Sequence, residues 1–169
     1  MKRTLSAKDQ EILITNNSSV LVYGFGNPGR NDDALGILFS EKLEEMNFPN
    51  ISFDSNYQLN AEDALLISEF DIVIFADASL TPESFSLKRL KPAPEVSFTT
   101  HAMHPSSVVA LCNQLYNKHP LCFLMEIRGY EWEMREQVSD RAMQNLKKAL
   151  EYSLPLIKER RLFVADREF

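Results

Sequence analysis

Cysteine is scarce in this sequence of 169 residues, which contains only Cys112 and Cys122. Two cysteines are too few for a disulfide framework, and their spacing is not that of a zinc knuckle. Both lie in apolar segments, so we expect buried, reduced thiols rather than catalytic groups. The length fits one domain, and a domain of this size can bury a core without disulfides or a structural metal.

The sequence also lacks long hydrophobic runs and an excess of positive charge. No segment approaches the ~20 apolar residues of a membrane helix. The basic first residues are not followed by an apolar run before Val20, so we expect no signal peptide, no membrane partner and a cytoplasmic protein. The 18 basic and 24 acidic residues give a formal net charge of −6, which offers no electrostatic footprint for nucleic acid.

Apolar patterning predicts an alternation of strands and helices. This alternation indicates a three-layer α/β domain with a mostly parallel sheet and helices on both faces. We expect an N-terminal arm at 1–18, a single domain at 19–161 and a C-terminal tail at 162–169. The predicted strands are 19–24, 50–55, 71–77, 121–128 and an edge strand at 85–90. The predicted helices are 33–46, one capped by Asn60, 105–116, and one from Ser139 to about Arg161 that is kinked or ended at Pro155.

A glycine-rich loop follows the first predicted strand of the domain. Residues 24–29 read Gly-Phe-Gly-Asn-Pro-Gly and match the spacing of a dinucleotide fingerprint. A pyrophosphate needs the bare N-terminus of the next helix, and Asp32 and Asp33 would repel it there. The loop also resembles the opening of peptidyl-tRNA hydrolase, but residues 30–36 depart from that family where its catalytic histidine stands. Peptidyl-tRNA hydrolase is therefore only a minor alternative.

Four residues are candidates for chemistry. Asp32 and Asp33 are adjacent, so they point in different directions; one caps the helix while the other projects toward the edge of the sheet, or both only cap. Asp77 ends the central apolar strand, and it shares a rim with Asp33 if their strands are neighbours. The alternative for Asp77 is a turn residue. His101 lies in a loop that leads into a helix, and we expect it on the same rim.

The other two histidines have simpler interpretations. His104 precedes Pro105, which disfavours a helical backbone, so we expect a structural role. His119 lies in a polar turn and is expected to be solvated. Two aspartates and one histidine are compatible with a divalent transition metal. No nucleophile pair of the Ser/His/Asp or Cys/His kind is suggested by the sequence.

These motifs resemble those of the NiFe-hydrogenase maturation endopeptidases. The matching segments, in order, are 22–27 with 32–36, then 74–78, then 100–103 with the following helix. The forms of residues 29–33, 57–59 and 101–105 resemble especially the branch that serves soluble, bidirectional hydrogenases. Many members of the family have glutamate where this chain has Asp33.

The resemblance implies a fold, a reaction and a site. The fold is a twisted five-stranded sheet between helices. The reaction is one cut, by an aspartyl-type endopeptidase, that removes the C-terminal extension of the hydrogenase large-subunit precursor after nickel insertion. The implied metal-contacting residues are Asp33, Asp77 and His101, with Asp33 and Asp77 as the catalytic pair. The nickel is expected to arrive with the precursor, and no organic cofactor is expected. The other hypothesis is a non-catalytic metal- or protein-binding module of the same fold.

Overall fold

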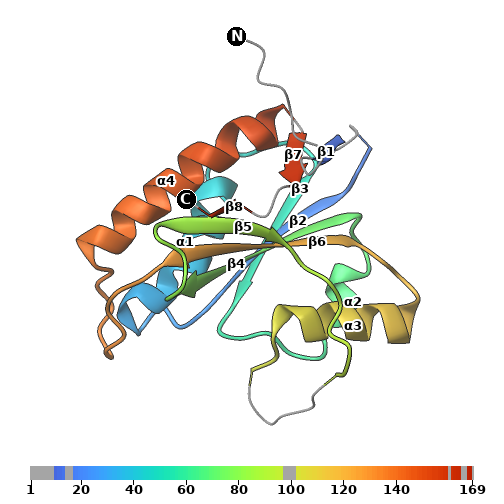
Figure 1. Cartoon of the computed structure of the whole chain (residues 1–169), viewed down its shortest axis with the longest axis horizontal. Helices are drawn as coiled ribbons and strands as arrows, with labels where there is room; N and C mark the ends of the chain where they lie inside the picture. Colours follow the sequence, from blue (N-terminus) through green and yellow to red (C-terminus); the bar gives the residue numbers. More distant parts are fainter. Residues whose placement is uncertain (1–9, 14–16, 97–101, 160, 165–166, 169) are drawn as a thin grey trace.

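The computed structural model describes residues 10–13, 17–96, 102–159, 161–164 and 167–168. Its main sheet has the strand order β3-β2-β4-β6-β5-β8, and a small second sheet pairs β1 with β7 (Figure 1). The strands are β1 (Gln10–Leu13), β2 (Val20–Phe25), β3 (Ile51–Asn56), β4 (Ile72–Ser79), β5 (Phe85–Arg89), β6 (Leu121–Arg128), β7 (Arg161–Val164) and β8 (Arg167–Glu168).

The main sheet is mostly parallel, as the sequence predicts. Strands β3, β2, β4 and β6 run parallel to one another, whereas β5 is antiparallel to β6. The five predicted strands are all present, and the two-residue β8 adds a sixth by pairing with the outer side of β5. The prediction that 85–90 is an edge strand is therefore wrong. The strand that covers this edge, β8, lies far from β5 in the sequence, so the residues around 85–90 do not indicate it.

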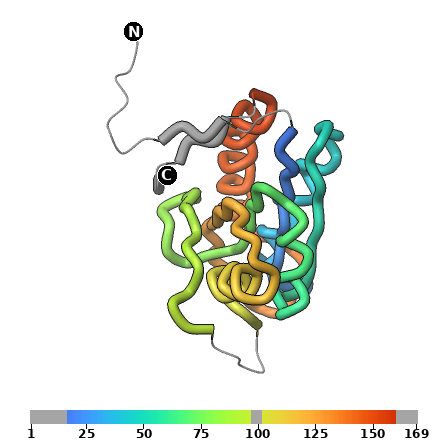
Figure 2. Tube along the Cα trace, turned by 90° about the vertical axis from the view of Figure 1, so that its right-hand side faces the viewer, coloured from blue at the N-terminus to red at the C-terminus, as the bar shows by residue number. Residues whose placement is uncertain are grey.

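Helices cover both faces of this sheet and complete the three layers. The helical elements are the 3-10 turn η1 (Asn31–Ala34), α1 (Leu35–Glu44), α2 (Asp63–Ile67), α3 (Pro105–Tyr116) and α4 (Asp140–Lys158). Residues of α1 and α4 share one apolar cluster with the sheet, and residues of α2 and α3 share the other. Figures 1 and 2 show α4 and α3 on opposite sides of the sheet.

Strand β4 shows why a continuous apolar run predicts a central strand. Ile72 and Ile74 pack into the cluster of α1 and α4, while Val73 and Phe75 pack into the cluster of α2 and α3. All four side chains are buried, so this part of the strand has no face available for polar residues. The last three residues of the strand are only partly buried, and the polar residue Asp77 is the first of them.

The helix boundaries confirm some predictions and correct others. Ser139 caps α4 by accepting the Ala142 N–H at 3.3 Å, as predicted. His104 caps α3 through its Nδ1, which accepts the Ser106 N–H at 3.2 Å, so its structural role is confirmed. Helix α4 continues past Pro155 to Lys158, so of the two alternatives predicted at Pro155 the ending is wrong, and the kink stays a prediction. Both cysteines are free and buried, as expected, and burial chiefly raises the pKa of Cys122 to about 12.

Two predicted helix starts differ from the structure. The helix predicted at 33–46 begins with the 3-10 turn η1, whose first turn has no side-chain cap. Asn60 does not cap α2, because the residue at the cap position is Glu62 and its side chain makes no capping hydrogen bond. Instead the Asp63 carboxylate accepts the Asn60 N–H at 2.7 Å, so the local hydrogen bond runs in the opposite direction.

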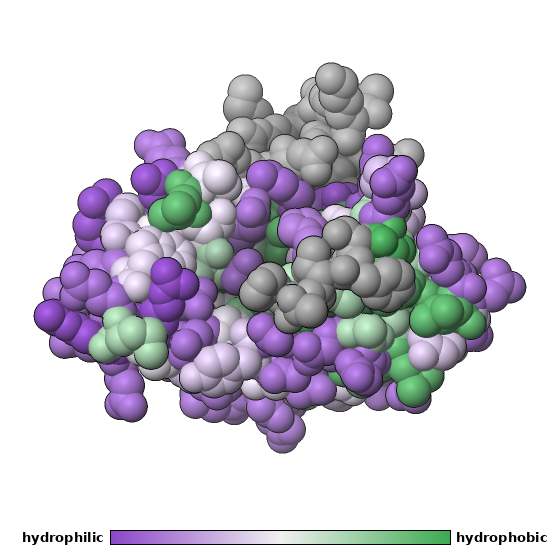
Figure 3. Space-filling model, turned by 90° about the horizontal axis from the view of Figure 1, so that it is seen from below, coloured by the Kyte–Doolittle hydropathy of each residue, from purple (hydrophilic) through white to green (hydrophobic). Residues whose placement is uncertain are grey.

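The outer surface over α2 and α3 combines hydrophilic and apolar side chains. Figure 3 shows this side of the molecule, where apolar side chains occur in small groups among polar ones. Leu65 on α2 and Leu115 on α3 are among the exposed apolar residues. In the part of the chain that the structure describes, no helix has the length and apolar character needed to cross a membrane. The division into 1–18, 19–161 and 162–169 stays a prediction.

Candidate functional site

The topology of the sheet has a switch point between β2 and β4. From β2 the chain first adds β3 on one side, and later adds β4 on the other side. Ligand sites of open α/β sheets lie outside the carboxyl ends of the strands at such a switch point. Asp33 follows β2, and Asp77 lies one residue beyond Ala76, which pairs with Gly24 of β2. The two strands are neighbours, so the condition for a shared rim is met.

Two glycines allow the segment around Asp33 to approach the sheet. Gly26 has a φ of +142°, and a Cβ there would collide with the main-chain oxygen of Asp33. A Cβ on Gly36 would collide with the main-chain oxygen of Ala76 in β4. The start of α1 therefore packs directly on strand backbone, and this close approach brings Asp33 toward the end of β4.

The Asp33 side chain is fixed by the glycine-rich loop. Its Oδ2 accepts the N–H of Asn27 at 3.0 Å, and the residue is partly buried. The loop is closed in turn by the Asn27 side chain, whose Oδ1 accepts the Gly29 N–H at 2.8 Å. The carboxylate is therefore held in one place, and a single loop hydrogen bond leaves further lone pairs available for a ligand.

Asp77 lies in an environment that opposes its negative charge. Burial is the main cause that raises its pKa to about 7, and the charges of Asp33 and Glu126 act in the same direction. A hydrogen bond from the Ala78 N–H opposes this shift only in part. Asp33 and Asp77 thus form a pair of carboxylates that repel each other in a poorly solvated place. A divalent cation or a proton would relieve that repulsion.

Asp32 has a separate role that the sequence did not predict. Its side chain is fully buried, and it accepts hydrogen bonds from the N–H groups of Tyr130 (2.7 Å), Glu131 (3.0 Å) and Ser139 (2.7 Å) and from the Ser139 hydroxyl (2.7 Å). Burial raises its pKa, but these hydrogen bonds outweigh burial and leave the pKa below its ordinary value. Asp32 therefore does not cap its own helix; it holds the start of α4.

Asn31 extends this attachment along the loop between β6 and α4. Its Oδ1 accepts the Glu133 N–H at 2.9 Å, and its Nδ2 donates to the Gln137 carbonyl at 2.6 Å. Arg30 adds a bond from Nε to the Trp132 carbonyl at 2.9 Å. Residues 30–32 thus fasten the 129–139 loop beside the segment that carries Asp33. Only the polar run before Asp33 hints at this in the sequence.

The third predicted site residue, His101, lies outside the described residues. Among the residues that are described, no three His, Cys, Asp or Glu side chains lie close enough together to hold a metal ion. The structure brings Asp33 and Asp77 together and places His104 and Asp32 in structural roles. Two carboxylates are suitable oxygen ligands for a divalent cation, and they leave room for ligands from elsewhere.

Sequence reasoning also missed Glu126 on β6. It is a single acid within a strand whose other residues before Arg128 are apolar, and this contrast was the available signal. Glu126 lies in register with Asp77 on the neighbouring strand. An acid at this position on a largely buried strand needs hydrogen-bond donors around it.

Comparison with solved structures identifies proteins of the same architecture. HycI, a NiFe-hydrogenase maturation protease from Thermococcus kodakarensis, is 21% identical with a TM-score of 0.68, over 86% of this chain and 96% of that one. The hydrogenase maturating endopeptidase HybD from Escherichia coli is 19% identical with a TM-score of 0.66, over the same shares of the two chains. No protein-family model matches the sequence, and no curated protein matches it either. At these identities the chain shares the fold of hydrogenase maturation proteases.

Proposed function

We propose that this protein is an endopeptidase that removes the C-terminal extension of a NiFe-hydrogenase large-subunit precursor. The observation that carries the proposal is the Asp33–Asp77 pair at the switch point between β2 and β4, on the fold of HycI and HybD. The forms of residues 29–33, 57–59 and 101–105 favour a precursor of a soluble, bidirectional hydrogenase. The reaction would then take place in the cytoplasm.

In the proposed mechanism the nickel is part of the substrate. Asp33 and Asp77, with His101 as the third residue implied by the family resemblance, contact nickel that is already bound in the precursor. The metal orients the scissile peptide and polarises its carbonyl group or a water molecule. The cut adds one water across the peptide bond. Because a precursor without nickel cannot engage the carboxylates in this way, the enzyme would cut only after metal insertion.

The experiment that tests this function compares cleavage of two forms of the precursor. The wild-type chain should shorten the nickel-loaded large subunit on a gel and leave the nickel-free form intact. Asp33→Asn should abolish cleavage while leaving the melting temperature within a few degrees, because Asp33 receives only one hydrogen bond from the described residues. Asp140→Asn removes an exposed carboxylate from the first turn of α4 and should cleave normally.

Each outcome of this comparison separates two explanations. If the wild-type chain binds the loaded precursor but never shortens it, the protein is a binding module. Equal cleavage of both precursor forms would show that the enzyme does not require nickel to recognise the precursor. Normal cleavage by Asp33→Asn would exclude the Asp33–Asp77 site. Release of tRNA from a peptidyl-tRNA would instead support the alternative that the protein is a peptidyl-tRNA hydrolase.

We expect the free enzyme to be purified without stoichiometric nickel or zinc. A structural metal site usually closes four protein ligands, whereas this site offers Asp33, Asp77 and, by resemblance, His101. Treatment with EDTA should therefore leave the melting temperature unchanged, since two apolar clusters stabilise the fold. Metal analysis and thermal melts with and without EDTA test this. Tightly held metal together with unfolding on chelation would contradict the proposal that the nickel comes with the substrate.

A further inference from the structure

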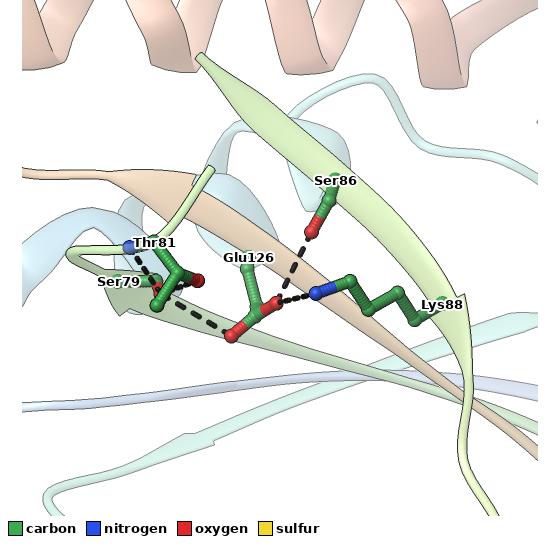
Figure 4. Close-up of polar contacts among 5 residues, drawn as sticks. All are labelled: Ser79, Thr81, Ser86, Lys88 and Glu126. Carbon is green, nitrogen blue, oxygen red and sulfur yellow. Dashed lines mark hydrogen bonds and ion pairs between the residues drawn. The ribbon is translucent and has the colours of Figure 1, made fainter. Parts of the chain in front are cut away.

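A partly buried ion pair lies on the face of the sheet that carries Asp77. Glu126 on β6 is in register with Asp77 on β4, and with Ser86 on β5 at its other side. Residues in register on adjacent strands point to the same side of a sheet. The Lys88 ammonium group lies 3.0 Å from Glu126 Oε2 (Figure 4). A carboxylate and an ammonium group therefore lie close to the proposed metal-binding pair.

Hydrogen bonds from both flanking strands fix the Glu126 carboxylate. Oε1 accepts the Ser79 hydroxyl at 3.2 Å, and Oε2 accepts the Ser86 hydroxyl at 3.1 Å as well as Lys88 Nζ (Figure 4). Ser86 is fully buried, and the Glu126 side chain is only 18% exposed. The Lys88 side chain is 42% exposed, so its charge is better screened by water. Glu126 is thus the more rigid and less solvated charge of the pair.

These contacts are made by side chains, whereas β4, β6 and β5 are paired through their main chains. The other residues of β6 before Arg128 are apolar, so packing alone does not call for an acid at position 126. The network instead surrounds a negative charge with three donors one strand away from Asp77. A fixed charge near two carboxylates changes the electrostatic potential that a bound cation meets.

We propose that Glu126 is a positioning residue whose fixed charge strengthens the hold of Asp33 and Asp77 on a divalent cation, and that Lys88 moderates this effect. The inference rests on the proposed function, because it assumes that the two aspartates contact the metal. It assigns opposite effects to two residues joined by one ion pair. Loss of the Glu126 charge weakens cation binding, whereas loss of the Lys88 charge strengthens it.

Titration calorimetry with Ni²⁺ alone tests these opposite effects on the purified protein. For charges a strand spacing or more from the metal, Coulomb energies predict about threefold to tenfold weaker binding in Glu126→Gln. They predict about twofold to fivefold tighter binding in Lys88→Gln, whose charge is better screened. Ser86→Ala removes a hydrogen bond to Glu126 but no charge, so its affinity should stay within about twofold of the wild type.

The pattern across variants decides between electrostatic and structural roles. If Glu126→Gln and Lys88→Gln both weaken Ni²⁺ binding, the pair only supports the fold and the inference is wrong. An unchanged affinity in Glu126→Gln also overturns it. If Glu126→Gln fails to fold in a thermal melt, tighter binding by Lys88→Gln supports the inference and weaker or equal binding contradicts it.

Asp77→Asn distinguishes failure of this inference from failure of the proposed function. If Asp77→Asn binds Ni²⁺ as tightly as the wild type, the aspartate pair is not the metal site, and both proposals fail. If Asp77→Asn loses binding while the two charge variants match the wild type, only the role of Glu126 and Lys88 is excluded.

Discussion

Asp32→Ala should lower the free energy of unfolding more than substitution of any exposed acid in this chain. The change leaves the N–H groups of Tyr130, Glu131 and Ser139 without their acceptor. Hydrogen bonds to a buried charge contribute about 1.5–3 kcal/mol each, and partial access of water to the loop offsets some of the loss. We expect destabilisation on the order of 3 kcal/mol at neutral pH, which corresponds to a melting temperature lower by roughly 10 °C.

Urea unfolding of Asp32→Ala beside Asp140→Ala measures this effect. Asp140 is also acidic and lies beside Ser139, but it is exposed, so its variant should remain within about 0.5 kcal/mol of the wild type. Because the pKa of Asp32 is lowered in the folded protein, its contribution to the free energy of unfolding depends on pH. Its contribution is present above the unfolded pKa of about 4 and is lost as the pH falls through the lower, folded pKa. Equal stability of wild type and Asp32→Ala at neutral pH would contradict the role assigned to Asp32.

Asp77→Asn should have the opposite effect on stability while abolishing Ni²⁺ binding and processing. In the folded protein, burial and the charge of Asp33 raise the pKa of Asp77 to about 7. The native state therefore holds this proton more tightly than the unfolded chain, whose Asp pKa is about 3.9. Stability consequently falls as the pH rises from about 4 to about 7. Asparagine carries no charge, so Asp77→Asn should be more stable by on the order of 2 kcal/mol at about pH 8, with little gain at about pH 4.

Asp71→Asn is the matched control for this prediction, because Asp71 directly precedes β4, at the end of the strand opposite Asp77. Its carboxylate accepts hydrogen bonds from the Ser19 N–H at 2.8 Å and the Ser19 hydroxyl at 3.1 Å. Asp71→Asn should therefore gain no stability and should keep both Ni²⁺ binding and cleavage. Urea unfolding at the two pH values, together with calorimetry, tests both variants. A less stable Asp77→Asn at alkaline pH would show that Asp77 supports the fold.

Much of the fold could be predicted because local patterns determine it. The unbroken apolar run of β4 predicts a strand covered on both faces, and the structure confirms this. The alternation of strands and helices predicts the mostly parallel sheet. One error, the edge position of 85–90, occurs where a distant segment decides the outcome. β8 pairs with β5 from the far end of the chain, and no local pattern around 85–90 could have indicated it.

Only part of the candidate site could be predicted from the sequence, because distant segments also contribute to it. The ends of β2 and β4 place Asp33 and Asp77 on one rim, which the sequence predicts on the condition that the two strands are neighbours, and the structure meets that condition. The role of Asp32 depends on a loop about a hundred residues later, so its sequence neighbours suggest only a helix cap. Glu126 and Lys88 come together through the pairing of β5 with β6. His101 lies outside the described residues, so its assignment stays a prediction.

Asp32 and Asp33 are adjacent, yet selection for stability acts differently on Asp32 and on the pair formed by Asp33 and Asp77. One turn of chain contains the best-satisfied carboxylate described above and a carboxylate that destabilises its partner Asp77. Selection for thermal stability alone would preserve Asp32 and remove the charge at Asp77, because satisfied groups stabilise a fold and strained functional groups oppose it. A stability-guided library would therefore lose the proposed reactive pair first. Retention of Asp77 among stabilised variants would itself report that selection for activity had acted.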